Sequence, residues 1–187
     1  MMIGRPLLTI LCAAVLSMPR VHAMAAPSGL AIDVIHYDAR IEPDLAAKAI
    51  QGTVTITFAV RGESQDWVEL DRGDLAIDSV REEGSPQAFS LHDRRVRIQL
   101  SRPARAGDTR TVDIAYHGAP RSGIRIFPER GQVYTVFSTS QWLVCVDAPE
   151  DKATLRLQLI LTAEDFQKEM EQSAGRSLTD FFSTWVY

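Results

Sequence analysis

The chain has 187 residues, a length that accommodates one domain of ordinary size and at most about one and a half. It carries 20 basic and 24 acidic residues, so its formal net charge is −4. An acidic chain offers little attraction to phosphate groups, and nucleic acid is therefore not an expected partner.

The first 26 residues are predicted to form a secretory signal peptide. They contain the basic stretch MMIGR, the apolar run PLLTILCAAVL, and small residues suited to cleavage near Ala23–Ala26. The run is shorter than the roughly 20 residues that cross a bilayer, so we expect no membrane span and a periplasmic or secreted protein. Cleavage would remove Arg5 and Arg20, leaving a net charge of −6, and Cys145 would be the only remaining cysteine.

From residue 32 to residue 161 apolar and polar residues alternate, which predicts half-buried antiparallel strands. The expected fold is mainly β, an antiparallel β-sandwich or saddle of about eight strands with one or two C-terminal α-helices. One cysteine cannot form an internal disulfide, so this fold must depend on its hydrophobic core. The expected strands are 34–41, 52–60, 66–70, 75–80, 94–100, 110–116, 131–137, 141–146 and 153–161.

The pattern changes to helical spacing after residue 162. Thr162 is a plausible N-cap for a first helix that ends at Gly175, and Ser177 is a plausible cap for a second. The second helix carries large apolar side chains that form a candidate docking surface, namely Leu178, Phe181, Phe182 and Trp185. The expected organisation is therefore a signal peptide (1–26), a β-domain (27–162) and a helical C-terminal segment (163–187).

Short motifs occur in order through residues 31–161. They are a Tyr-Asp pair in the first strand, a Gly-Thr-Val strand, a strand that ends in Tyr-x-Gly, and a Cys-x-Asp-x-Pro-x-x-Lys-Ala segment. Together they resemble the N-terminal β-domain of the aminopeptidase N-like zinc metallopeptidase (gluzincin) family. The resemblance implies a structural family motif made of Tyr37, Asp38, Gly52, Tyr116, Gly118, Cys145, Asp147, Pro149, Lys152 and Ala153.

Residues 163–187 resemble a distant part of the same family, the helices that end its catalytic domain. The shared pattern is Phe-x-x-x-Met-Glu, then Gly-Arg, then Phe-Phe-x-x-Trp. This implies a β-domain joined to a remnant of the catalytic domain across an internal deletion. The last strands of the β-domain would be missing after Leu161, so we expect at least one unprotected sheet edge.

The resemblance implies zinc chemistry whose residues are missing from this sequence. In the family, His-Glu-x-x-His on a helix supplies two zinc ligands and a general base. His36, His92 and His117 precede Tyr, Asp and Gly instead of Glu, and Thr135–Ser138 hold no equivalent of the family's amine-binding Gln or Glu. We therefore expect no cofactor, no metal ligand, no catalytic residue and no enzymatic activity.

Single residues also allow chemical interpretations that we weigh lower. The three histidines could bind a metal, but a solvent-facing strand position and two turns explain them more simply. Cys145 could be a nucleophile, but its apolar flanks favour a packed thiol. Asp147 and Pro149 favour a turn in which the carboxylate accepts hydrogen bonds from backbone N–H groups.

The favoured hypothesis is a truncated, catalytically inactive, exported relative of a zinc aminopeptidase. Its β-domain would pack on a catalytic domain, as the resemblance implies. One alternative is an exported β-sandwich module that binds a protein partner, or a second copy, through the C-terminal aromatic helix. Another is a fragment of a genuine metalloaminopeptidase, produced by a split gene or an assembly artefact.

Overall fold

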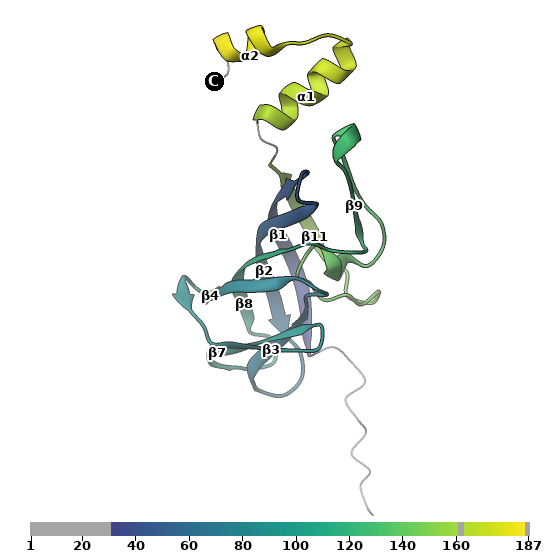
Figure 1. Ribbon diagram of the computed structural model, residues 1–187. Coiled ribbons are helices and arrows are strands. Elements are labelled where there is room, and N and C mark those ends of the chain that lie inside the picture. The colour runs from purple at the N-terminus through teal and green to yellow at the C-terminus, as the bar shows by residue number, and fades with distance from the viewer. Residues whose placement is uncertain (1–30, 161–162, 186–187) are drawn as a thin grey trace, which may run out of the picture.

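The structure is a computed structural model that describes residues 31–160 and 163–185. The predicted signal peptide lies outside the described residues. Within them the chain is mainly β, as predicted, and two short helices follow the last strand (Figure 1). No described helix has the length and apolar character that crossing a membrane requires.

A six-stranded sheet forms the larger layer of the β-domain, with strand order β11-β1-β2-β8-β4-β5. All neighbours are antiparallel except β11, which runs parallel to β1. The strands are β1 (Ile32–Asp44), β2 (Ala49–Val60), β4 (Ala76–Glu82), β5 (Ser85–Pro86), β8 (Thr109–Gly118) and β11 (Thr154–Leu159).

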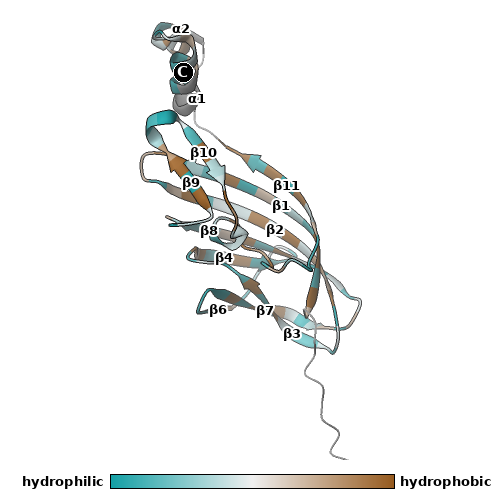
Figure 2. Ribbon diagram, turned by 90° about the vertical axis from the view of Figure 1, so that its right-hand side faces the viewer, coloured by the Kyte–Doolittle hydropathy of each residue, from teal (hydrophilic) through white to brown (hydrophobic). Residues whose placement is uncertain are grey.

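A three-stranded sheet, in the order β3-β7-β6, forms the smaller layer, and a separate hairpin of β9 and β10 lies beside the larger sheet (Figure 2). These strands are β3 (Gln65–Asp71), β6 (Phe89–His92), β7 (Arg95–Ala104), β9 (Ile124–Phe127) and β10 (Gln132–Thr135). Short 3-10 helices span Pro128–Arg130 and Thr139–Gln141. The α-helices are α1 (Ala163–Ala174) and α2 (Thr179–Trp185).

The hydrophobic core lies between the two sheets and follows the predicted alternation. On β2, Val54, Ile56 and Phe58 are at most 1% exposed, whereas the threonines between them face outward. One position of β1 departs from the prediction. A register shift between Val34 and His36 inserts an extra residue, so Ile35 is 46% exposed and not part of the core.

A buried ion pair joins the two layers. Arg110 on β8 and Glu82 on β4 are 3% and 1% exposed, and the Arg110 guanidinium donates to the Glu82 carboxylate at 3.0 Å. Glu82 also accepts the backbone N–H of Ser101 on β7, and Arg110 donates to the Arg102 carbonyl at 3.3 Å. Because both charges are paired and hydrogen-bonded, their burial is tolerated and fixes the larger sheet against β7.

The strand prediction was wrong for residues 141–146. This stretch forms the end of a 3-10 helix and an irregular segment with one isolated bridge, between Asp71 and Cys145. A continuous apolar run indicates burial on all sides, which a packed irregular segment satisfies as well as a strand does. The chain also forms short strands that the alternation did not indicate, namely β5, β6 and β9, so the described strands outnumber the predicted eight.

The two C-terminal helices lie where helical spacing predicted them. Gly175 follows α1 with a left-handed backbone, φ +62°, which a glycine adopts without steric cost. The second helix begins at Thr179, two residues after the predicted cap Ser177. Its start is fixed by Glu171, whose carboxylate accepts the backbone N–H of Leu178 at 2.7 Å.

Candidate functional site

Several of the family-motif residues converge on one buried segment, residues 141–147, which we call the anchored segment. Its apolar members Trp142, Leu143, Val144 and Cys145 are at most 7% exposed. The segment crosses the end of β3, where the backbones of Asp71 and Cys145 exchange hydrogen bonds of 2.7 and 3.0 Å. Buried backbone groups outside a sheet need partners of their own, and the motif residues provide them.

Two buried tyrosines of the larger sheet hold the anchored segment by hydrogen bonds. Tyr37 on β1 accepts the Val146 backbone N–H at 3.0 Å, and Tyr116 on β8 donates its hydroxyl to the Trp142 carbonyl at 3.1 Å. Gly52 on β2 lies against the Tyr116 ring. A Cβ there would approach the ring's Cζ atom to 2.9 Å, so any larger residue would displace the tyrosine.

Acidic side chains hold the far end of the anchored segment. The Asp71 carboxylate accepts the Asp147 backbone N–H at 3.0 Å. Asp147 in turn accepts the hydroxyl of Ser140 at 2.7 Å and its backbone N–H at 3.4 Å. The sequence prediction that Asp147 accepts from backbone N–H groups is therefore correct, although its partner is Ser140 and not the turn that contains Pro149.

The remaining motif positions lie around this centre without meeting in one site. Asp38 on β1 pairs with Arg156 on β11 at 3.4 Å, and Gly118 lies close to Leu75, where a Cβ would approach at 3.1 Å. Pro149 lies in the turn that Asp151 closes onto Ala148. Lys152 is exposed and Ala153 packs against the core.

Burial makes the ionisable groups of this region unreactive. Desolvation, reinforced by the negative charge of Asp147, raises the pKa of the Cys145 thiol well above its ordinary value. Desolvation also raises the pKa of Tyr37 and of Tyr116. The thiol is thus protonated at neutral pH, and the anchored segment carries no nucleophile.

The fold opposes the ionisation of the Asp151 carboxyl group. One oxygen accepts the Val34 backbone N–H at 3.0 Å, and the other is buried without a partner among the described residues. Desolvation, partly offset by that hydrogen bond, raises the pKa of Asp151 above its ordinary value. The carboxylate form therefore costs free energy in the folded state.

The three histidines of the described residues bind separate neighbours. His36 on β1 is hydrogen-bonded to Thr154, His92 on β6 to Glu69, and His117 on β8 to Asp78, over 2.7–2.8 Å. The His92 contact, with those of Arg97, lowers the pKa of Glu69. His117 lies within a strand and not in the predicted turn. Among the side chains that the structure describes, no three His, Cys, Asp or Glu residues cluster as a metal site would.

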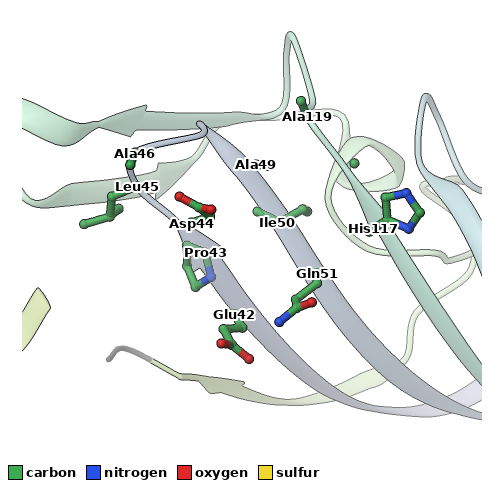
Figure 3. Close-up of a pocket in the computed structure, with 11 residues that line it drawn as sticks. Glu42, Pro43, Asp44, Leu45, Ala46, Ala49, Ile50, Gln51, His117 and Ala119 are labelled. Carbon is green, nitrogen blue, oxygen red and sulfur yellow. The ribbon is translucent and has the colours of Figure 1, made fainter. Parts of the chain in front are cut away.

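An open hollow of about 720 Å³ lies at the tip of the β1–β2 hairpin (Figure 3). Figure 3 shows Glu42 and Gln51 on neighbouring strands at one side and His117 on β8 at the other. The side chain of His117 is engaged by Asp78. The hollow therefore offers scattered polar groups and no convergent set of ligands or catalytic side chains.

The predicted C-terminal docking surface is only partly exposed. Phe182 is 1% exposed, whereas Phe181 is 55% exposed, and the two rings meet edge to face with centroids 5.6 Å apart. Leu178 is half-buried, and the side chain of Trp185 lies outside the described part of the structure. Among the members of the predicted surface whose side chains are described, Phe181 is thus the exposed aromatic residue.

Sequence reasoning missed Asp71 and Glu171, which position neighbouring backbone groups. Asp71 ends a predicted strand and Glu171 lies within a predicted helix, so neither position is unusual for its residue type. Glu171 gathers Gln167, Ser177, Leu178 and Thr179 around its carboxylate, and the hydrogen bond from Gln167 is the main cause of its lowered pKa. An acid eight residues before the start of α2 was the available signal.

Comparison with known proteins gives consistent matches. The family model described as the Peptidase M1 N-terminal domain matches residues 34–168. Aminopeptidase N of Lactobacillus helveticus is 31% identical in an alignment 145 residues long, which covers 70% of this chain and 16% of that protein. The chain therefore spans about a sixth of the length of this curated relative.

Solved structures match over the same region. A two-domain M1 zinc metallopeptidase mutant bound to L-arginine is 26% identical with a TM-score of 0.65, over 72% of this chain and 33% of its own. A mutant M1 zinc metallopeptidase from Deinococcus radiodurans, bound to a Tyr-Ser-Ala substrate, is 26% identical with a TM-score of 0.63. The match covers 69% of this chain and 32% of that protein's chain. Aminopeptidase A of Legionella pneumophila shares the fold at 15% identity, with a TM-score of 0.62. The match covers 73% of this chain and 17% of that protein's chain.

We predict that Tyr37→Phe destabilises the protein. The substitution leaves the Val146 backbone N–H buried without an acceptor, which costs roughly 1–3 kcal/mol. Urea unfolding measures the loss, and faster modification of Cys145 by a thiol reagent reports loosening of the anchored segment. Tyr134→Phe, at a tyrosine that is 49% exposed, is the matched control and changes little. Equal stability of Tyr37→Phe and the parent protein would contradict this role.

We predict that Asp151→Asn stabilises the protein at neutral pH. The raised pKa means that the folded state binds the Asp151 proton more tightly than the unfolded state does, so the penalty is present above the folded pKa. This free-energy penalty decreases as the pH falls from the pKa of Asp151 in the folded state to below its pKa in the unfolded state. Asparagine keeps an acceptor for Val34 without the charge.

The measurement is urea unfolding of the parent protein and of Asp151→Asn over a pH series. The stability advantage of the variant should shrink as the pH falls through the acidic range. Glu63→Gln, in an exposed turn, is the control and should show no such trend. A difference that stays constant with pH, or that grows on acidification, is incompatible with a desolvated carboxylate at Asp151.

Proposed function

The chain belongs to the Peptidase M1 N-terminal domain family, and from this premise we propose that it is a truncated, catalytically inactive relative of a zinc aminopeptidase that retains the N-terminal β-domain. The observation that carries the proposal is the extent of the match. It covers the N-terminal domain, and the chain aligns with only 32–33% of the two-domain zinc metallopeptidases.

The residues present do not fit the zinc ion that the family implies. The sequence has no His-Glu-x-x-His. The three histidines are on β1, β6 and β8, and each has a neighbour of its own. Cys145 is 3% exposed and its thiol is protonated at neutral pH, so it offers neither a ligand nor a nucleophile. No step of hydrolysis can be assigned to the described side chains.

We predict that the purified chain does not hydrolyse aminoacyl-naphthylamide substrates, with or without added zinc. An intact two-domain M1 peptidase, assayed in parallel, verifies that the substrate and the added zinc support hydrolysis. Zinc content, measured on the dialysed protein, should be far below one ion per chain. Stoichiometric zinc together with hydrolysis that a chelator abolishes, after removal of host peptidases, would overturn the proposal.

A second candidate function is a protein-interaction module that docks through α2. Two exposed apolar side chains of the C-terminal helices, Phe181 on α2 and Met170 on α1 at 42% exposure, favour it because apolar side chains at the surface gain free energy when a partner covers them. Phe181→Lys should then weaken any complex seen by native mass spectrometry. A complex that survives this substitution excludes the α2 surface.

A third candidate is a fragment of a complete metalloaminopeptidase, supported by the short share of each relative that the chain spans. Sequencing the gene across the codons for residues 161–166 decides it. A reading frame for a His-Glu-x-x-His domain at that point, or in a neighbouring gene, would support a fragment. Uninterrupted coding sequence as printed supports the inactive relative.

We further propose that the protein is exported, on the basis of the basic, apolar and small-residue pattern of residues 1–26. Intact-mass measurement on protein recovered from the periplasm or medium should give a chain that begins between Met24 and Pro27. Its measured isoelectric point should fall, since Arg5 and Arg20 are removed. A full-length chain that stays in the cytoplasm contradicts export.

A further inference from the structure

The outer edge of β11 is open. β11 ends the six-stranded sheet, and no strand of the described residues pairs with its far side (Figure 2). The Ile160 N–H donates to the Ile41 carbonyl of β1, so alternate residues of β11 turn their backbone groups toward β1. The backbone N–H and C=O groups of Leu155, Leu157 and Leu159 consequently point to the open edge.

The side chains of the same three leucines lie on the core face of the sheet. In the parallel register, Leu155, Leu157 and Leu159 pair with Tyr37, Ala39 and Ile41. The three β1 residues are at most 8% exposed, whereas the leucines are 39–55% exposed. The packing that covers the core face of β1 therefore does not extend fully over β11, where the apolar face is partly exposed.

β11 has none of the features that usually protect a sheet edge. It contains no proline, no lysine and no bulge. Its one charged residue, Arg156, faces away from the leucines and pairs with Asp38 at 3.4 Å. The opposite edge of the sheet is β5, which has only two residues and includes Pro86. Edge pairing is therefore favoured at β11 over β5.

We propose that two copies of the chain associate through antiparallel pairing of β11 with β11, about a two-fold axis at Leu157. In this register Leu155 faces Leu159 of the second copy, so all three leucines pair on one face. Arg156 faces the neutral Gln158. An axis at Arg156 instead would oppose two guanidinium groups and is disfavoured.

The proposal is independent of the proposed function, because it uses the backbone edge and not the missing chemistry. One pair of six-residue strands gives an interface at the small end of protein complexes, below about 1,200 Å². We therefore expect a reversible dimer whose population rises with protein concentration.

Sedimentation velocity and light scattering over a wide concentration range test the association. The mass should rise from the 20.8 kDa of one chain toward twice that value. Leu157→Lys should weaken dimerisation by about a hundredfold, because it removes two apolar contacts and opposes two charges at the axis. Leu91→Lys, at a leucine that is 46% exposed on β6, is the matched control and should dimerise normally.

Cysteine cross-linking tests the register, in chains that also carry Cys12→Ser. Residues that face each other with backbone hydrogen bonds have Cα atoms about 5.5 Å apart, within the range of a disulfide. Leu157→Cys should therefore form a disulfide-linked dimer on mild oxidation. Leu155→Cys should not, since the two copies of that residue lie more than about 13 Å apart in this register.

A chain that stays monomeric at every concentration overturns the proposal, as does cross-linking of Leu155→Cys but not Leu157→Cys. If Phe181→Lys loses the dimer while Leu157→Lys keeps it, the association is through α2, and this result also overturns the proposal. Zinc-dependent hydrolysis by a dimer would refute the proposed function alone. A catalytically silent monomer would refute this inference alone.

Discussion

The fold depends on how the anchored segment satisfies its buried backbone. This segment belongs to no sheet, yet Leu143 and Val144 are at most 1% exposed, so its polar groups have no access to bulk water. The hydroxyls of Tyr37 and Tyr116 and the backbone of Asp71 supply the missing partners. Both tyrosines reach it from the larger sheet. Gly52 is required for the same reason, because only a residue without a side chain leaves room for the Tyr116 ring.

The alternation of apolar and polar residues predicted the strands that have one buried and one solvated face. It was least informative for segments that lack this two-faced burial. On β2, β7 and β8 the predicted apolar positions are buried, because sheet geometry enforces a period of two, but the burial of Arg110 on β8 was not predicted. The anchored segment is apolar at every position, and such a run does not distinguish a strand from a packed irregular chain. The bulge at Ile35 depends on the pairing of β1 with β2, which the local pattern of β1 does not reveal. The Glu171 cap is local in sequence, but an acid within a helix is too common to indicate a cap by itself.

The candidate site could be located from the sequence but not interpreted from it. Motif spacing identified Tyr37, Tyr116, Cys145 and Asp147, which meet around one segment, while Asp38, Gly118 and Lys152 lie apart from it. Residue type alone allowed chemistry at Cys145. Burial decides against it, since a desolvated thiol next to carboxylates keeps its proton. The interactions that stabilise the centre of the domain thus remove its reactivity, which directs functional questions to its surfaces.

The parallel strand at the sheet edge links stability to association. Parallel strands are normally covered on both faces, because their connections place other elements over the sheet. Here β11 follows the anchored segment and joins β1 on one side only, and its leucines extend past the layer that covers β1. Its pairing with β1 is therefore supported by one ladder of hydrogen bonds and little apolar burial. Any partner that adds a strand or covers the leucines stabilises β11 as it binds, so the least protected strand of the domain is also its best candidate for contact with other molecules.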